Sequence, residues 1–396
     1  MPPAKPLDGI RVLDLATFIA APLTASILGE FGAEVIKIEH PEGGDPMRRF
    51  GTATDDPDRT LAWLSEARNK HSVTLDLKSP EGAATLKELV RRSDILCENF
   101  RPGTLERWGL GPDVLHQLNP ALVILRISGY GQTGPYRDRP GFARIAHAVG
   151  GLSHLAGMPD GPPVTPGSTS LADYISGYYG VIGVLMALRV AEATGKGQII
   201  DVALFESIFR VLDETAPVYD KFGIVRGREG TATRQVCPHG HFPCADGNWV
   251  AIACTSDKMW QRMALNVLAR PELAESHPKT ADRLAGRPLI DGIVEAFTKL
   301  HPMAEVVRLC SDGDVPCGPI NSIADIFADP HFAARGTIAR VTDATLGEIA
   351  VPNVMPRLSE TPGEITHLGP AMGDWNERIK DILSDDSQLR STGVND

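Results

Sequence analysis

Apolar runs of strand length alternate with helical segments through the first half of the chain. Residues 11–15 and 35–38 are such runs, and residues 21–28 between them form a helical segment that is entered through Pro22 and ends near glycines. A strand, a helix and a second strand within so short a stretch predict a βαβ unit, in which the two strands lie parallel in one sheet.

The same alternation continues to about residue 205. Ser79-Pro80-Glu81 predicts the start of a helix, because proline is favourable at the first helical position. A long apolar helix follows the Gly/Pro-rich loop 157–167 and ends at the glycines of 195–197. Further buried strands are predicted at 94–97, 122–127 and 198–202. We therefore expect an α/β fold with a Rossmann-like, doubly wound parallel sheet.

The pattern changes near residue 222, where a polar linker rich in arginine and glycine begins. A strand at 249–254, helices at 257–268 and 288–309, and a proline-rich turn at 314–320 predict a smaller α+β domain. Residues 338–351 alternate apolar and polar positions, which predicts strands, and a helix is expected near 375–383. The chain thus divides into a large domain, 1–221, a small domain, 222–330, and a tail, 331–396.

The composition is that of an ordinary globular protein and narrows the function classes. The net charge of −11 is spread along the 396 residues without a basic face, so nucleic-acid binding is not expected. The N-terminus has no apolar signal segment, and the apolar stretch 174–188 is too short to span a bilayer. The six unevenly spaced cysteines are typical of reduced thiols. We expect a cytoplasmic protein with no membrane partner.

Asp173 is the strongest candidate for chemistry. It lies at the start of the long apolar helix, where a carboxylate faces unpaired backbone N–H groups and the positive end of the helix dipole. That position predicts an ionised carboxylate available as a nucleophile. The alternative is that Asp173 only caps the helix, a common use of aspartate at this position.

Glycines 177, 180 and 183 lie three residues apart on the same helix. Each glycine inside a helix costs about 1 kcal/mol relative to alanine, so this spacing predicts that another element, most simply a second helix, approaches that face closely. The Asp173 end of the helix is then a rigid platform, which suits a functional site.

The sequence favours neither a dinucleotide site nor a zinc site. The first βαβ unit with Glu39 at its end resembles a dinucleotide site, but the turn at 16–22 lacks the GxGxxG glycines that a pyrophosphate needs. Cys237, His239, His241 and Cys244 are residue types that bind zinc, but their spacing is not one of the common patterns. A loop with buried thiols is favoured, and no metal site is predicted. The alternative is an NAD-dependent reductase, which should show saturable binding of a nicotinamide cofactor.

Several short segments, in order along nearly the whole chain, resemble the class III coenzyme A transferases, the family of formyl-CoA transferase and carnitine CoA-transferase. The matching segments are 12–15, 32–39, 69–78, 98–103, 128–135, 160–163, 171–173, 195–198 and 315–319. Any one of these matches is weak, but the ordered set is highly specific. The resemblance implies two chains that interlock as rings in a homodimer, with the sheet domain built from both termini.

The resemblance also implies a role for Asp173. In this family the matching aspartate attacks an acyl-CoA thioester, and the resulting mixed anhydride is converted to an aspartyl-CoA thioester that the acceptor acid then attacks. An ionised carboxylate needs no general base for this step. The site must exclude water, since hydrolysis would waste the intermediates. Coenzyme A and acyl-CoA are therefore expected as substrates, with no permanently bound cofactor.

The CoA contacts carry over by matching positions. Leu75, Lys78, Asn99 and Phe100 match residues that line the nucleotide, and Arg107 matches an arginine on the phosphate side. The further match, His40, stands where formyl-CoA transferase has an arginine, and phosphates favour cationic partners. The alternative for Lys78 and Arg107 is ordinary surface charge.

Residues that differ from the family pattern narrow the set of reactions that we expect. Ile19 stands where formyl-CoA transferase has a glutamine, and Phe142 and Ala143 replace its tyrosine and glutamate, so formate–oxalate exchange is not expected. The related α-methylacyl-CoA racemases have a catalytic histidine at the position of Phe142, which cannot carry a proton. A racemase-type isomerase and a non-catalytic acyl-CoA-binding protein remain the alternatives.

Segments 141–146 and 232–254 are similar to succinyl-CoA-dependent dicarboxylate transferases. These act on C4–C5 acids such as malate, citramalate, itaconate or glutarate. The second carboxylate of such an acid needs a cation in the pocket, and arginine binds carboxylates through two hydrogen bonds. Arg144 is the predicted partner, with Arg226, Arg228 and Arg234 as alternatives.

Overall fold

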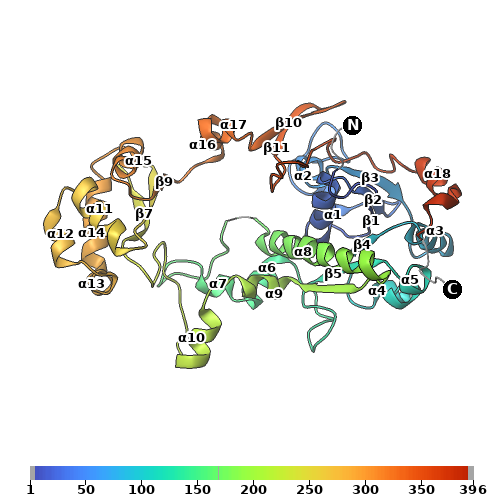
Figure 1. Cartoon of the computed structure of the whole chain (residues 1–396), viewed down its shortest axis with the longest axis horizontal. Coiled ribbons are helices and arrows are strands. Elements are labelled where there is room, and N and C mark those ends of the chain that lie inside the picture. Colours follow the sequence, from blue (N-terminus) through green and yellow to red (C-terminus); the bar gives the residue numbers. More distant parts are fainter. Residues whose placement is uncertain (1–4, 168, 391–396) are drawn as a thin grey trace. The chain divides into compact units, whose positions relative to one another are not determined.

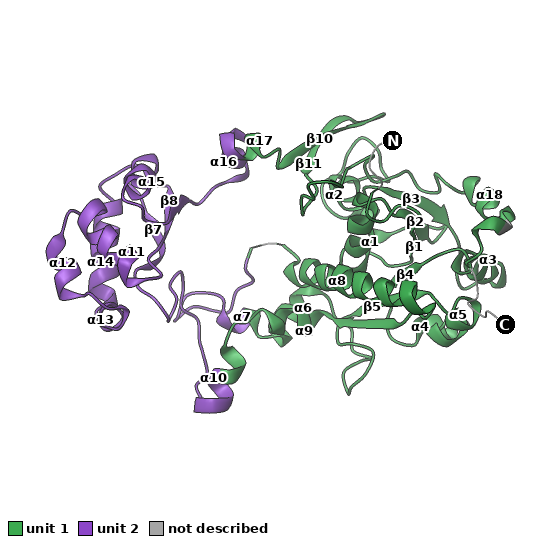
Figure 2. Cartoon of the chain, viewed as in Figure 1, with its two compact units in different colours: residues 1–152, 167–217, 332–396 green, residues 153–166, 218–331 purple. Residues whose placement is uncertain are grey.

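The computed structural model describes residues 5–167 and 169–390. The chain forms two compact units: unit 1 comprises residues 1–152, 167–217 and 332–396, and unit 2 comprises 153–166 and 218–331 (Figure 1, Figure 2). Residues 153–166 therefore lie in unit 2, although the large domain predicted from the sequence, 1–221, contains them. The domain boundaries expected there, after 221 and after 330, stay a prediction.

Unit 1 is built on a sheet of six parallel strands in the order β3-β2-β1-β4-β5-β6. The order reverses between β1 and β4, so the predicted doubly wound parallel sheet is confirmed. The strands are β1 Arg11–Asp14, β2 Glu34–Glu39, β3 Lys70–Thr74, β4 Ile95–Glu98, β5 Val123–Ser128 and β6 Ile199–Ala203.

The central strands are buried on both faces, which explains their nearly continuous apolar sequences. Successive residues point to opposite faces, so Val12 joins one core, between the sheet and helices α1 and α8. Leu13 joins the other core, on the face covered by α3 and α5. The helices of unit 1 are α1 Ala20–Glu30, α2 Leu61–Glu66, α3 Pro80–Val90, α4 Thr104–Arg107, α5 Pro112–Leu118, α6 Ala143–Val149, α8 Leu171–Thr194, α9 Leu204–Arg210 and α18 Arg378–Ser384.

Helix α8 packs against α1 and strand β5 along its glycines. A Cβ atom at Gly180 would lie 2.4 Å from Thr24 Oγ1, and one at Gly177 would lie 2.8 Å from the carbonyl oxygen of Ala20. The Thr24 hydroxyl also donates a hydrogen bond of 2.9 Å to the carbonyl oxygen of Gly177. The predicted close approach of a second helix is therefore confirmed.

Helix α8 is also longer than the apolar stretch suggested. Its 24 residues make it, within the described residues, a helix long and apolar enough to cross a membrane by length and composition alone. The expectation that this segment is too short to span a bilayer is therefore wrong. One such helix is weak evidence for a membrane protein, and α8 packs on the sheet as a core helix does.

The C-terminal segment of the chain pairs with the N-terminal part of unit 1. Trp375 N–H donates a hydrogen bond of 2.9 Å to the carbonyl oxygen of Ser72, and Asn69 N–H donates one of 3.1 Å to that of His367. The predicted strands of this segment are confirmed as the hairpin β10 Ile338–Asp343 and β11 Gly347–Pro352. Unit 1 is thus assembled from the two ends of the chain.

Unit 2 has its own antiparallel sheet, β7-β8-β9, and its own core around Trp260. The strands are β7 His239–Pro243, β8 Trp249–Ala253 and β9 Cys317–Pro319. Residues 314–320 were expected as a turn, but 317–319 pair with β8 as a strand. The main helices are α11 Asp257–Arg262, α12 Pro271–Ser276, α13 Thr280–Ala285, α14 Arg287–Thr298, α15 Met303–Asp312 and α16 Ile323–Ala328. Helices at the unit boundaries are α7 Leu152–Leu155, α10 Thr215–Phe222 and α17 Pro330–Ala334.

Candidate active site

Two adjacent cavities of unit 1 lie beyond the carboxyl ends of its parallel strands. Residues that follow β1, β2, β3 and β4 line the larger cavity, and residues that follow β1, β4 and β5 line the smaller one. This is the edge at which open α/β sheets bind ligands, at the point where the strand order reverses. The linings of the two cavities share Thr17, Phe100 and Arg101.

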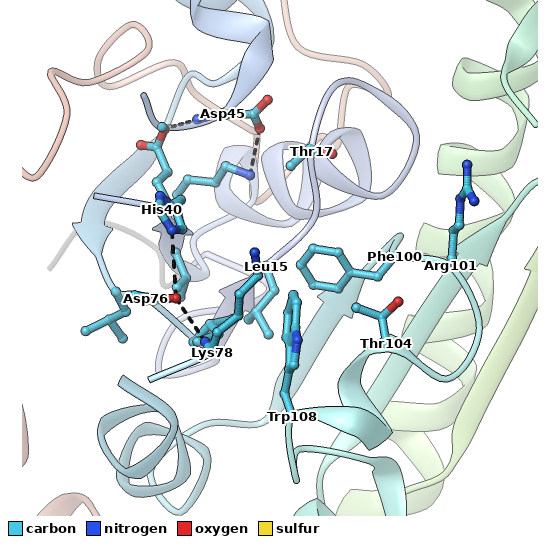
Figure 3. Close-up of a pocket in the computed structure, with 16 residues that line it drawn as sticks. Leu15, Thr17, His40, Asp45, Asp76, Lys78, Phe100, Arg101, Thr104 and Trp108 are labelled. Atoms are coloured by element: carbon cyan, nitrogen blue, oxygen red, sulfur yellow. Dashed lines mark hydrogen bonds and ion pairs between the residues drawn. The ribbon is translucent and has the colours of Figure 1, made fainter. Parts of the chain in front are cut away.

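The larger cavity, of about 380 Å³, is mostly apolar with cations at its border. The rings of Phe100 and Trp108 meet edge to face, with their centroids 5.2 Å apart. Figure 3 shows Arg101 extending away from this aromatic pair. The predicted CoA-binding residues His40, Leu75, Lys78 and Phe100 all line this cavity.

The polar groups of this cavity are ordered by Asp76. Its Oδ1 atom accepts a hydrogen bond of 3.0 Å from Lys78 N–H and lies 3.8 Å from His40 Nε2 (Figure 3). The Lys78 side chain makes no hydrogen bond or ion pair with the described residues and is exposed, so its ammonium group is available to an anionic ligand.

Asp173 lines the smaller cavity, of about 200 Å³, together with the predicted residues Ile19, Phe142 and Asn99. The structure thus brings the proposed nucleophile and two expected substrate-binding residues into one cavity. Segments that lie far apart in the sequence supply them: the start of α1, the start of α6 and the first turn of α8.

Two of the predicted residues lie outside both linings. Arg107 is exposed on α4 and donates a hydrogen bond of 2.9 Å to the hydroxyl of Thr104, which does line the larger cavity. Arg144 is exposed on α6 and lines neither cavity. The alternatives to Arg144, which are Arg226, Arg228 and Arg234, belong to unit 2.

Three arginine residues do line the Asp173 cavity: Arg101, Arg137 and Arg139. Arg139 lies over the ring of Tyr136, with its central carbon 3.7 Å from the ring centroid. Sequence reasoning missed them, although Arg137 and Arg139 directly follow the matched segment 128–135, which was the signal that could have found them.

The carboxylate of Asp173 accepts no hydrogen bond within the described part of the chain, and burial raises its pKa to about 7. This differs from the expectation that the helix start keeps it ionised. The reason is that burial penalises the charged form. In the same turn, Ala172 N–H donates a hydrogen bond of 3.0 Å to His147 Nε2. The cap interpretation of Asp173 is not supported either, because its side chain makes no capping bond.

The loop between β1 and α1 is fixed by two side chains. The Asn99 side-chain oxygen accepts a hydrogen bond of 2.8 Å from Thr17 N–H, and its amide nitrogen donates one of 2.7 Å to the Thr17 carbonyl oxygen. Asp45 accepts a hydrogen bond of 3.1 Å from Phe18 N–H. Phe18 has φ of 63°, a left-handed conformation that is unfavourable for an aromatic residue and persists only where its surroundings impose it. The amide of Asn99 therefore holds this loop, and its expected contact with CoA stays a prediction.

Asp45 is itself held by buried charges. Lys37 Nζ lies 2.9 Å from Asp45 Oδ2 and 3.6 Å from Asp14 Oδ2, and Lys70 Nζ lies 2.7 Å from the same Asp14 atom. Burial alone would lower the pKa of Lys37, but the carboxylates of Asp14, Asp45 and Glu39 outweigh it and raise that pKa. Paired buried charges fix geometry, because removing one partner leaves the other without compensation.

The Cys/His segment has a structural place in unit 2. Cys237 and Cys244 are buried in its core, and His239 and His241 lie on β7. Over residues 5–167 and 169–390, no group of three or more His, Cys, Asp or Glu side chains could hold a metal ion.

Comparisons with known proteins agree with this architecture. The model of CoA-transferase family III matches residues 7–376. The chain is 58% identical to the succinyl-CoA–L-malate CoA-transferase alpha subunit of Chloroflexus aurantiacus, over 96% of this chain and 89% of that protein. It is 42% identical to the succinyl-CoA–D-citramalate CoA-transferase of Chloroflexus aurantiacus, over 95% of this chain and 94% of that protein.

A human relative and a solved structure extend the comparison. The human succinyl-CoA:glutarate CoA-transferase is 32% identical, over 99% of this chain and 90% of that protein. A crystal structure of a CAIB/BAIF family protein from Brucella suis superposes with a TM-score of 0.84 at 32% identity, covering 96% of this chain and 100% of that one. The chain therefore belongs to CoA-transferase family III.

Proposed function

We propose that the protein moves CoA from succinyl-CoA to a C4–C5 dicarboxylic acid, with Asp173 as the covalent carrier. The observation that carries this proposal is a single cavity lined by Asp173, whose carboxylate makes no hydrogen bond or ion pair with the described residues, and by Arg101, Arg137 and Arg139. The names of the relatives support the substrate class, since each pairs succinyl-CoA with a dicarboxylate. L-Malate and citramalate are the first acceptors to test.

The reaction begins when a carboxylate oxygen of Asp173 attacks the thioester carbonyl of succinyl-CoA. The CoA thiolate leaves, a mixed anhydride forms, and the thiolate then attacks the Asp173 carbonyl to release succinate and leave an aspartyl-CoA thioester. The acceptor carboxylate repeats the two steps in reverse order. With a pKa of about 7, a large fraction of Asp173 is ionised at neutral pH, so no general base is needed.

CoA would occupy the larger cavity. Its adenine ring suits the apolar wall of Leu75, Phe100 and Trp108, and Lys78 and Arg101 suit its phosphates. The wall shared by the two cavities, at Thr17 and Phe100, would guide the thiol arm toward Asp173.

The arginines would bind the free carboxylate of the acceptor. They line the same cavity as Asp173 yet do not lower its pKa, whose only shift comes from burial. We therefore assign these guanidinium groups to the distal carboxylate of a C4–C5 acid, which arginine binds through two hydrogen bonds. Arg144, the residue expected from the sequence, lines neither cavity, and its contact with the acceptor stays a prediction.

We further propose a cytoplasmic, interlocked homodimer. Helix α8 carries exposed apolar side chains, with Tyr178 and Ile182 each 51% and Met186 62% exposed, which favours burial against another chain. Relatives called alpha and beta subunits, 58% and 57% identical to this chain, make a second, similar chain the alternative partner. The free cysteines of the described residues fit a reducing compartment.

The test is incubation with succinyl-CoA and a panel of carboxylic acids, followed by mass spectrometry of the CoA esters. New dicarboxylyl-CoA masses that vanish in Asp173→Asn would support the transfer and identify the acceptor. An intact-protein mass shift after succinyl-CoA alone would reveal the covalent adduct. Exchange of the α-proton without new esters would instead favour a racemase-type isomerase, and saturable binding without either would favour a non-catalytic acyl-CoA-binding protein.

A further inference from the structure

A buried histidine contacts the start of the helix that carries Asp173. His147 lies on α6 with 1% of its surface exposed, and its Nε2 atom accepts a hydrogen bond of 3.0 Å from Ala172 N–H. Because this nitrogen accepts, its lone pair must be free, and the proton of the neutral ring sits on Nδ1.

The bond replaces a cap that helix α8 otherwise lacks. The residue at its N-cap position, Ser170, makes no side-chain capping bond. Asp173 directly follows Ala172 in the first turn of α8, so the bond to the imidazole fixes the turn from which the Asp173 carboxylate reaches the cavity.

His147 is not explained by stability alone. Its Nδ1 atom is buried and has no hydrogen-bond partner among the residues that the structure describes, and an unpaired buried donor costs about 1–3 kcal/mol. A helix cap contributes about 0.5–2 kcal/mol. The two contributions are of similar size and opposite sign, so the imidazole gives the fold little net stability.

We propose that His147 is a positioning residue, which bonds the Ala172 N–H group and so holds the first turn of α8, with the Asp173 carboxylate, at the cavity. The inference rests on the proposed role of Asp173. It is supported by the protonation state of the ring, because burial and the nearby charge of Arg144 lower the pKa of His147 and keep it neutral. A cationic imidazole could not accept the Ala172 hydrogen bond.

The test compares His147→Leu with His147→Gln. Leucine fills the space without an acceptor, whereas the side-chain oxygen of glutamine reaches about the position of Nε2 and can accept the same bond. We expect His147→Leu to lower kcat by about 10- to 100-fold, as misplacement of a reacting group does, with KM for succinyl-CoA unchanged. His147→Gln should restore kcat to within a few-fold of wild type, and the unfolding temperature of both variants should stay close to that of wild type.

The matched control is His116→Leu, since His116 also bonds to backbone, at the carbonyl oxygen of Leu122, but on α5, which covers the other face of the sheet. It should keep full kcat. Wild-type kcat in His147→Leu, or an equal loss in His147→Gln, would overturn the proposal. If the leucine variant does not fold, a tenfold loss of kcat in a folded glutamine variant overturns it. Activity that persists in Asp173→Asn would instead reject the proposed function itself.

Discussion

Asp173 combines two properties that oppose each other in a folded protein. Its half-buried carboxylate makes no hydrogen bond or ion pair with the described residues, and burial raises its pKa to about 7. The same isolation makes the ionised form more reactive, because no bond must be broken before it attacks. Function at this residue is therefore expected to cost stability, as at many reactive sites.

The first prediction concerns the pH dependence of adduct formation. The single-turnover rate of Asp173 with succinyl-CoA should fall about tenfold per pH unit below pH 7 and level off above it, since only the ionised carboxylate attacks. Stopped mixing with intact-mass detection measures this rate. A rate that stays constant from pH 5 to 8 would mean that the carboxylate is ionised throughout and that its surroundings do not raise its pKa.

The second prediction concerns stability at the same residue. The pKa of Asp173 is raised from 3.8 to about 7 in the folded state, so its favourable contribution is complete below pH 4 and is lost as the pH rises through 7. Asp173→Asn should therefore unfold at a higher temperature than wild type at pH 8, with the difference shrinking toward pH 4. A variant less stable than wild type at pH 8 would contradict this.

Lys78 offers a third prediction, on the binding of CoA. Lys78→Ala should raise KM for succinyl-CoA by about 10- to 100-fold with little change in kcat, because one charge-assisted hydrogen bond is worth about 1.5–3 kcal/mol. Lys196→Ala is the control, an exposed lysine just beyond the far end of α8. Equal KM values in the two variants would remove Lys78 from the CoA site.

At the scale of elements, the contact between α1 and α8 depends on the absence of side chains. A Cβ atom at Gly180 would lie 2.4 Å from Thr24 Oγ1 and 2.9 Å from Leu125 Cδ2. Gly180→Ala should therefore destabilise unit 1 by about 1–3 kcal/mol, although alanine favours helix by about 1 kcal/mol. Gly292→Ala on α14 is the control, because nothing lies within 4 Å of its added Cβ. It should keep or gain stability in denaturant unfolding.

The β1–α1 loop gives a prediction that separates two roles of Asn99. If its amide holds Thr17, as the two hydrogen bonds indicate, Asn99→Ala should lower kcat by about tenfold, since loosening the loop displaces the reacting groups. A direct CoA contact would instead raise KM for every CoA ester with kcat intact. Steady-state kinetics with succinyl-CoA and acetyl-CoA distinguishes the two outcomes.

Strands that contain an apolar run could be predicted, and the mostly polar strand β3 could not. Strands β1, β2, β4 and β5 each contain such a run beside buried charges, and each was expected within a residue or two of its bounds. Strand β3 was missed because Lys70 and Ser72 are buried in it, and only the ion pair with Asp14, formed across the fold, makes that burial possible.

The residues of the candidate site, too, could be predicted from the sequence only in part. Asp173, Ile19 and Phe142 could be proposed from single positions and the family resemblance. His147 could not, because its role depends on one hydrogen bond between α6 and α8, and hydrophobic periodicity says nothing about such a contact.

At the scale of the whole molecule, an acidic chain with a net charge of −11 is proposed to bind a polyanionic substrate. Local cations at the two cavities must therefore outweigh the overall repulsion, which acts over about a Debye length.

The proposed dimer gives a prediction at the same scale. Light scattering should give twice 42.6 kDa, and Ile182→Glu should lower that mass by burying a charge in the interface. Lys196→Glu, beyond the apolar face, should not.

The pairing of Trp375 with Ser72 has a consequence for how the protein is made. A ribosome synthesises the strand and loop residues of unit 1 long before residues 332–390 emerge. The nascent N-terminal half must wait, with its sheet edge incomplete, while residues 218–331 of unit 2 can fold first. The last residues translated then complete the unit that holds both cavities. A stop codon that removed them would leave Asp173 in the chain but deprive its unit of the segment that covers β3.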